Sequence, residues 1–226
     1  MNLKKLAVAV GALAISGSAL AELSANIGVT SNYVWRGVTQ TDDSAAISGG
    51  IDYAHESGFY VGTWASNVDF EDTTGGQAEV DLYGGFSNEL ASGLGYDAGV
   101  IYYAYPQADK PDDELDFTEI YGNVSYGPVS GGISYTVDKE AGGDENDLYY
   151  HISASTDIKD GWGIGATLGY YDYDDDTDYT HGQIDITKDV GDFGAFIFSV
   201  SGVLDQDDDL DLDDNAIVFV SWAKSF

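Results

Sequence analysis

The feature that most constrains the fold is an alternation of apolar and polar side chains, repeated in segments of about ten residues. In one segment, for example, Val80 and Leu82 alternate with Glu79 and Asp81. Because successive side chains of a β-strand point to opposite faces, each segment predicts a strand with one apolar and one wet face. No comparable stripe at the 3.6-residue spacing of a helix occurs after residue 21. The pattern therefore predicts an all-β protein.

About twelve such segments occur, and the connections between them alternate in length. The short connections lie near His55–Gly58, Ala91–Gly93, Gly127–Pro128, Lys159–Gly161 and Asp189–Asp192. The long ones lie near Val38–Ala45, Phe70–Gln77, Pro106–Leu115, Lys139–Asn146, Asp174–Thr180 and Asp205–Asp214. This sorting predicts a transmembrane antiparallel up-and-down β-barrel, with short periplasmic turns and longer acidic extracellular loops. A soluble β-sandwich is the alternative all-β fold, but it gives no reason for the sorting.

The charge of the chain is strongly negative, with 40 acidic residues against 8 basic ones. The acidic residues concentrate in the long connections, and Asp205–Asp214 alone holds seven of them. This charge excludes nucleic acid as a partner, because nucleic-acid binding needs clustered Lys and Arg. The acidic loops predict weak binding of divalent cations, which would bridge them to anionic lipid head groups. The periodic arrangement of the aromatic residues, 13% of the chain, argues against disorder.

The N-terminal segment has the features of a cleaved signal peptide over residues 1–21. Lys4 and Lys5 precede an apolar stretch from Leu6 to Ile15, and residues 19–21 read Ala-Leu-Ala, the pattern that signal peptidase cleaves. The stretch is shorter than the roughly 20 residues that a membrane-spanning helix needs. We therefore expect export through the periplasm to the bacterial outer membrane and a barrel over residues 22–226.

Aromatic residues on the predicted outward faces gather at two levels. Those near the periplasmic end are Tyr60, Tyr96, Tyr126, Trp162, Trp222 and Phe226. Those in the other half are Trp35, Phe70, Tyr102, Tyr135 and Tyr170. Two aromatic girdles that flank an apolar band are typical of a barrel embedded in lipid.

The same strand register predicts which side chains line the lumen. They are Arg36, Asp52, Asp69, Glu79, Asp81, Tyr83, Asp97, Tyr103, Glu119, Tyr121, Asp138, His151, Tyr171 and Asp185. Arg36 is the only arginine of the chain, and we expect it to pair with a carboxylate of the wall. The other charges are acidic, and tyrosine ring faces attract cations, so the register favours passage of cations over anions.

The last strand places Val218, Val220, Trp222 and the terminal Phe226 on one face, interrupted by Lys224. A terminal aromatic residue on such a strand resembles the signal that the bacterial barrel-assembly machinery recognises. The lysine can extend its ammonium group to the lipid head groups. We therefore expect this machinery to be a partner of the chain.

Several segments resemble a known family. They are NIGVTSNYVWRG at 26–37, TQT at 39–41, GGIDY at 49–53, GFYVGTWASN at 58–67, EVDLYGG at 79–85 and AKSF at the C-terminus. Together they resemble the TorF-type porins, which were first catalogued as a conserved family of unknown function. The resemblance covers nearly all of the chain after residue 21 and is densest up to about Tyr105. It implies an outer-membrane barrel of a Gram-negative bacterium and a porin role, with no established substrate or site to transfer.

Catalytic and metal-binding patterns are not found in the sequence. The three histidines have no metal or catalytic spacing: His55 is expected in a turn, His181 at the edge of a loop and His151 on the polar face. The acidic stretches 205–216 and 172–183 lack the Gly and Glu of a calcium-binding EF-hand loop. There is no Cys for a disulfide or a thiolate ligand. We expect no enzyme activity, no cofactor and no dedicated metal site.

The predicted function is a porin-like channel for passive diffusion of small cationic or neutral solutes. Barrels of about eight strands are filled by side chains and those of sixteen leave an open channel, so about twelve is ambiguous. A structural or adhesive barrel with a plugged lumen therefore remains an alternative. A lipid-acting enzyme would need a Ser and a His exposed together on the lipid side, whereas His151 is predicted to face inward.

Overall fold

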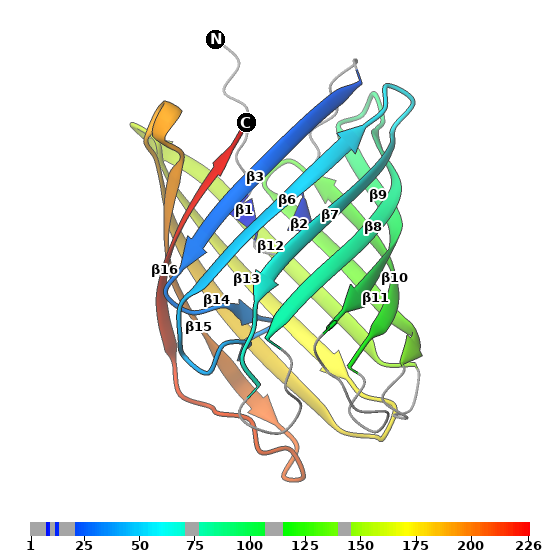
Figure 1. Cartoon of the computed structure of the whole chain (residues 1–226), viewed down its shortest axis with the longest axis vertical. Helices are drawn as coiled ribbons and strands as arrows, with labels where there is room; N and C mark the ends of the chain where they lie inside the picture. The colour runs from blue at the N-terminus through cyan, green and yellow to red at the C-terminus, as the bar shows by residue number, and fades with distance from the viewer. Residues whose placement is uncertain (1–7, 10–11, 14–20, 71–76, 107–114, 140–145) are drawn as a thin grey trace.

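The computed structural model describes residues 8–9, 12–13, 21–70, 77–106, 115–139 and 146–226. Twelve strands form a closed barrel (Figure 1). They are β3 (Glu22–Thr30), β6 (Ala46–Ala54), β7 (Phe59–Asn67), β8 (Ala78–Glu89), β9 (Leu94–Ala104), β10 (Phe117–Tyr126), β11 (Val129–Lys139), β12 (Leu148–Lys159), β13 (Trp162–Asp172), β14 (Asp178–Asp189), β15 (Ala195–Gln206) and β16 (Ile217–Ser225). Each pairs antiparallel with its neighbour along the chain, and β16 pairs with β3 to close the ring. The predicted antiparallel up-and-down β-barrel of about twelve strands is confirmed.

A few short elements are not part of the barrel wall. A two-stranded sheet of β1 (Val8–Ala9) and β2 (Ala12–Leu13) precedes the barrel, and a second is formed by β4 (Val34–Trp35) and β5 (Val38–Thr39). A single 3₁₀ turn, η1 (Gly191–Phe193), connects β14 to β15. No helix within the described ranges is long and apolar enough to cross a membrane. The predicted signal peptide falls mostly on residues that the structure does not describe.

The two ends of the barrel differ in the length of their connections. Short turns join the strands at the end where the C-terminus lies, and long loops join them at the opposite end (Figure 1). We call these the short-turn end and the long-loop end. Parts of three predicted long loops, residues 71–76, 107–114 and 140–145, lie outside the described residues.

The outer face of the barrel is apolar. Leu82, Ile133 and Ile152, all predicted to face lipid, are 54%, 41% and 56% exposed. A closed wall whose exposed side chains form an apolar band satisfies all of its backbone hydrogen bonds internally and is suited to a lipid environment. Val218, Val220 and Phe226 are likewise exposed, and the indole of Trp222 donates to the backbone oxygen of Phe193 at 2.9 Å.

The predicted register of β7 is wrong by one residue. Tyr60 was expected to face outward, but it is only 8% exposed and its hydroxyl donates to Asp97 at 2.6 Å. Its neighbours Phe59 and Val61 are the exposed residues. Asp69 was expected in the lumen on the same register, but it is exposed and lies beyond the end of β7. Because side chains alternate along a strand, one error of parity accounts for both.

Asp138 was also predicted to line the lumen, and it is exposed instead. The pairing of β10 with β11 shifts at this point, so that Glu119 is opposite Thr136 while Thr118 is opposite Asp138. A β-bulge places two residues of one strand against one of its partner and reverses the parity beyond it. Lys139 takes the inward position, where it pairs with the buried Asp147 at 2.5 Å.

Candidate functional site

Residues 31–45, which connect β3 to β6, fold into the barrel. We call them the inward loop. Its tip is a two-residue turn between β4 and β5, in which Arg36 and Gly37 have φ angles of 49° and 89°. Positive φ at both central positions is the geometry of a type I′ hairpin turn. A Cβ added at Gly37 would lie 2.5 Å from Cβ of His181, so glycine allows the tip to approach the wall at β14.

The base of the inward loop is fixed by a compact set of polar contacts. The Asn32 amide donates to Asp43 at 2.6 Å and accepts from the Thr39 hydroxyl at 2.7 Å. Thr41 is fully buried, and its hydroxyl donates to the backbone oxygen of Ser44 at 2.6 Å. Asn32, Thr39 and Thr41 lie in the segments at 26–37 and 39–41 that carry the family resemblance. That part of the sequence therefore builds the inward loop.

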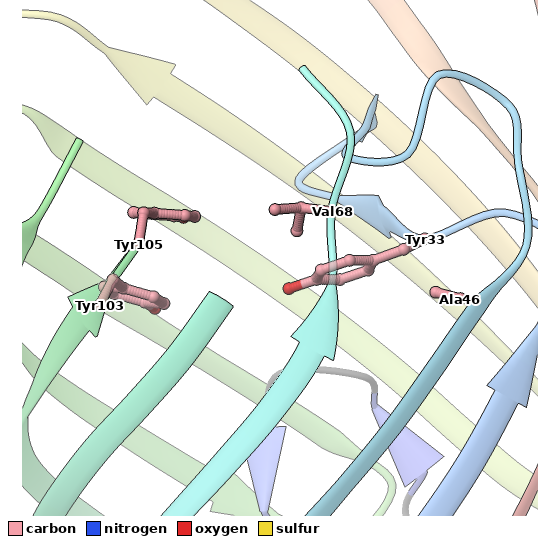
Figure 2. Packing of buried hydrophobic residues seen from close by; sticks show 5 residues of the cluster. All are labelled: Tyr33, Ala46, Val68, Tyr103 and Tyr105. Carbon is pink, nitrogen blue, oxygen red and sulfur yellow. The ribbon is translucent and has the colours of Figure 1, made fainter. Parts of the chain in front are cut away.

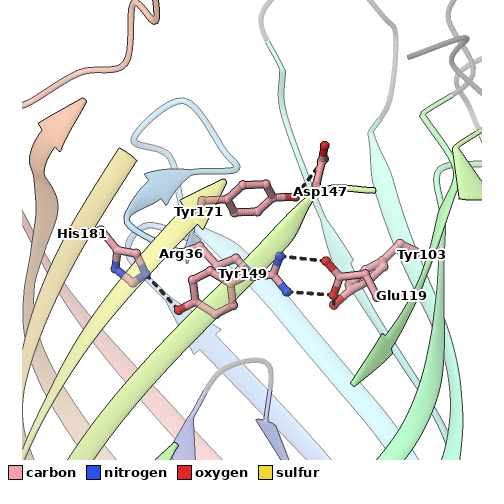
Figure 3. A network of polar contacts seen from close by, with 7 residues as sticks. All are labelled: Arg36, Tyr103, Glu119, Asp147, Tyr149, Tyr171 and His181. Atoms are coloured by element: carbon pink, nitrogen blue, oxygen red, sulfur yellow. Dashed lines mark hydrogen bonds and ion pairs between the residues drawn. The ribbon is translucent and has the colours of Figure 1, made fainter. Parts of the chain in front are cut away.

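An ion pair crosses the lumen from the tip of the inward loop to the wall. The Arg36 guanidinium donates to both carboxylate oxygens of Glu119 on β10, at 2.8 and 2.7 Å (Figure 3). The two side chains are 8% and 2% exposed. Bidentate pairs of this kind are the strong form of charge-assisted hydrogen bond. Arg36 thus lies in the lumen as expected, although a hairpin carries it there and not a wall strand.

Aromatic rings enclose the same guanidinium. Its central carbon lies 4.1 Å from the ring centroid of Trp35, 4.1 Å from that of Tyr149 and 5.2 Å from that of Tyr171. Cations within about 6 Å of a ring face are attracted by the negative charge of the ring faces. We call Glu119, Trp35, Tyr149 and Tyr171 the guanidinium pocket. It combines one carboxylate with three aromatic faces.

A first aromatic cluster packs one side of the inward loop against β6, β9 and the chain after β7. Its buried members are Tyr33, Ala46, Val68, Tyr103 and Tyr105 (Figure 2). The Tyr33 hydroxyl donates to Glu79 at 2.9 Å, and that of Tyr105 donates to the other oxygen of Glu79 at 3.3 Å. Phe70, predicted to face outward, packs its ring on Tyr105 with centroids 5.6 Å apart. The prediction for Phe70 is therefore wrong.

A second aromatic cluster lies across the lumen and consists of Tyr149, Tyr171, Tyr179 and Val203. The Tyr179 hydroxyl donates to the backbone oxygen of Arg36 at 3.1 Å. Trp35 packs against both clusters, so the inward loop spans the lumen from wall to wall. The sequence placed Trp35 in the outer girdle, and this is wrong because the chain turns inward after Thr30.

The histidines on the wall belong to the second cluster. His181 was expected to be wet at a loop edge, but β14 begins at Asp178 and His181 is only 3% exposed. Its Nε2 forms a hydrogen bond with the Tyr149 hydroxyl at 2.9 Å, and the rings stack. The ring of His151, which faces inward, also stacks on Tyr149. These histidines position a ring of the guanidinium pocket.

The remaining inward carboxylates lie at different heights on the wall, for example Asp81 near the long-loop end of β8 and Asp52 near the short-turn end of β6. Asp52 accepts from Tyr83 at 2.5 Å, and Asp185 accepts from Ser199 at 2.6 Å. Asp81 differs, because its Oδ1 is buried and has no hydrogen-bond partner among the described residues. The wall strands direct these predicted residues into the lumen: Asp52, Glu79, Asp81, Tyr83, Asp97, Tyr103, Glu119, Tyr121, His151, Tyr171 and Asp185.

No cluster of three or more His, Asp or Glu side chains in the described ranges is arranged to hold a metal ion. The sequence pattern did not predict that the connection between β3 and β6 folds into the lumen. The signal that could have revealed it is Arg36-Gly37, since a residue pair suited to a tight hairpin turn interrupts what otherwise reads as a strand.

Comparison of the sequence with protein families gives one match, over residues 14–212, to a bacterial protein family of unknown function, Gcw_chp. The chain belongs to the Gcw_chp family. No curated protein matches the sequence.

Solved structures share the barrel with this member of the Gcw_chp family. A KdgM porin in complex with disordered oligogalacturonate matches with a TM-score of 0.57 and 10% identity, covering 88% of this chain and 98% of that one. The COG4313 outer membrane channel from Pseudomonas putida F1 matches with a TM-score of 0.54 and 10% identity, over 92% and 96% of the two chains. The NanC porin matches with a TM-score of 0.53 and 10% identity, over 90% and 98%. At this identity the likeness concerns the fold.

Proposed function

We propose that the protein is an outer-membrane porin-like channel for passive diffusion of small cationic or neutral solutes, with the inward loop as its constriction. The observation that carries the proposal is the imbalance of charge on the inner wall. Arg36 is neutralised by Glu119 and Lys139 by Asp147. Among the described residues, the inward carboxylates without a basic partner are Asp52, Glu79, Asp81, Asp97 and Asp185. A confined space of one sign raises the local concentration of the opposite ion.

Other features support the same proposal. The apolar outer face fits lipid, and the barrel is shared with outer-membrane channels. The resemblance to TorF-type porins, the signal-peptide pattern at residues 1–21 and the aromatic C-terminus all favour export to a Gram-negative outer membrane and insertion there by the barrel-assembly machinery. On this orientation the short-turn end is periplasmic and the acidic loops are extracellular.

A structural or adhesive barrel with a plugged lumen is the second candidate. The observation in its favour is the inward loop, whose two aromatic clusters fill the lumen near the long-loop end. A lipid-acting enzyme has less support, because His151 and His181 face the interior and His55 lies in a turn, where it bonds to Ser57. We therefore propose no enzymatic activity.

Single-channel recording in planar bilayers under a salt gradient tests the proposal. We expect a small conductance with a reversal potential on the cation-selective side. Asp185→Asn should reduce the selectivity, because it removes an inward charge. Asp69→Asn and Asp138→Asn are matched controls, since both carboxylates are exposed and outside the lumen wall. An anion-selective pore would overturn the proposed selectivity. Absence of any conductance, even when the inward loop is replaced by a flexible linker, would favour the structural barrel.

A further inference from the structure

The guanidinium pocket, which the Arg36 side chain occupies, is formed mostly by residues of the barrel wall. Glu119 is on β10, Tyr149 on β12 and Tyr171 on β13, so only Trp35 would leave if the inward loop moved away. The wall residues also have partners of their own. Tyr149 bonds to His181 at 2.9 Å, Tyr171 to Asp147 at 3.4 Å, and Glu119 accepts from Tyr103 at 3.5 Å. The wall side of the pocket is therefore held in place without Arg36.

The geometry of the pocket selects a planar, forked cation. Two parallel hydrogen bonds of 2.8 and 2.7 Å match the two nitrogens of a guanidinium to the two oxygens of Glu119. The rings of Trp35 and Tyr149 both pack against the central carbon of the Arg36 guanidinium, with each ring centroid 4.1 Å from that carbon. An ammonium ion is a compact point charge and cannot make this bidentate, stacked arrangement.

Charge also requires that the pocket hold a cation. Glu119 is 2% exposed, and a buried carboxylate left without its partner is strongly unfavourable. Asp81, on the same face of β8 as Glu79, has a buried oxygen without a hydrogen-bond partner among the described residues. When Arg36 withdraws, another cation of the same shape is therefore favoured at Glu119.

From these observations we propose that the guanidinium pocket is a recognition site for solutes that carry a guanidinium group, and that Arg36 is an internal competitor that holds the site when no solute is bound. The inference rests on the proposed channel function and names a solute class for it. A solute of this class would displace Arg36 from Glu119, release the tip of the inward loop and so favour its own passage.

Binding of free guanidinium to the Arg36→Ala protein tests the site separately from conductance. The probe is guanidinium chloride at millimolar concentration, followed by intrinsic fluorescence of the folded protein in detergent micelles. We expect saturable binding to Arg36→Ala and at least about tenfold weaker apparent binding to the unsubstituted protein, where the resident side chain reduces the fraction of open sites. Potassium chloride at equal ionic strength and tetramethylammonium should bind at least about tenfold more weakly, because neither has the planar fork.

Two variants keep the test decisive. Arg36→Lys retains a positive charge and should fold, yet it should leave the bidentate position free for guanidinium. The double variant Arg36→Ala, Glu119→Gln should lose binding. Saturable binding to Arg36→Ala that disappears in the double variant supports the site. A response that is equal for all salts, or that persists without Glu119, overturns it.

Bilayer recording of the same variants separates the two proposals. If guanidinium reversibly interrupts the current through Arg36→Ala, and does so over the same concentration range as the fluorescence change, the result supports both the channel function and the site. A conducting barrel with no guanidinium binding overturns the site and leaves the channel standing. Binding without conductance in any variant overturns the channel function and leaves a ligand-binding barrel.

Discussion

The two halves of the lumen differ although one set of strands builds both. Towards the long-loop end the inward loop covers the wall, and Thr41, Glu119 and Tyr179 are at most 2% exposed. Towards the short-turn end, Asn123 is half-buried and Ser125 is exposed. The inward loop, and not the width of the barrel, therefore narrows the long-loop half of the lumen. This one segment is held in place by an ion pair and by packing between aromatic rings.

Replacing residues 33–40 with a Gly/Ser linker of equal length should have the largest effect. The substitution removes Tyr33, Trp35 and Arg36 from the lumen and leaves the wall strands intact. We expect a several-fold higher single-channel conductance, because the long-loop half would become as open as the other half. Folding is checked by the mobility shift of the barrel on heating in detergent. An unchanged conductance of the folded variant would place the constriction elsewhere.

Glu119→Gln should lower the free energy of unfolding more than Asp185→Asn does, because the inward loop is anchored at Glu119 and not at Asp185. Loss of one partner from a buried ion pair costs about 3–5 kcal/mol, because a charge is left uncompensated. Asp185 accepts hydrogen bonds from the uncharged side chains of Ser199 and Gln183, and an asparagine oxygen can still accept there, so we expect a loss of about 1 kcal/mol. Urea unfolding in lipid vesicles measures both variants. Equal losses would show that the inward loop is not anchored by its ion pair.

Gly37→Ala should loosen the inward loop by an intermediate amount. A positive φ at a residue other than glycine costs on the order of 1–3 kcal/mol. Here the new Cβ would also meet His181. Gly191→Ala is the control, since Gly191 has φ 65° and nothing within 4 Å of an added Cβ. We expect more frequent open–closed fluctuations of the current in Gly37→Ala only. Similar fluctuations in both would assign the effect to backbone strain alone.

The smallest effect should come from a surface ion pair. Lys159 and Asp160 are 3.9 Å apart in a short turn and 82% and 78% exposed. Exposed pairs contribute about 0–1 kcal/mol, so Lys159→Ala should leave urea unfolding and conductance nearly unchanged. A clear loss would mean that the short-turn end contributes to stability in a way that its exposure does not suggest.

The fold and most of the inner face could be predicted from the sequence because burial in a barrel repeats with the period of the strand. In β8, acidic Glu79 and Asp81 face in and Leu82 faces out, so the residues specify the register without ambiguity. In β7 both Tyr60 and Val61 are apolar enough for either face, so the pattern does not decide which of them points outward. The bulge beside Asp138 depends on pairing with β10, which one strand's own sequence does not contain.

The candidate site was harder to predict because its position depends on where a loop folds. Tyr33 and Trp35 continue the alternation of β3, and nothing in their spacing separates a strand from a hairpin. The role of Arg36 as a partner of a wall carboxylate was expected, but the choice of Glu119 and the rings around it arise from segments more than 80 residues apart in sequence. Such contacts are set by tertiary packing, which the local pattern does not encode.

The seam between β3 and β16 gives the inward loop a place in the order of folding. Backbone hydrogen bonds join Phe226 to Ala25, and Val220 donates to the Ser31 side chain at the root of the inward loop. These contacts link the two ends of the chain, and contacts of such sequence separation are slow to form because they close the largest loop. We therefore expect the seam between β3 and β16, where the inward loop begins, to be the last joint of the barrel to form. Before that joint closes, the tip of the inward loop could enter the lumen from the side, between two strands that are not yet paired. After closure, only the mouth of the long-loop end remains.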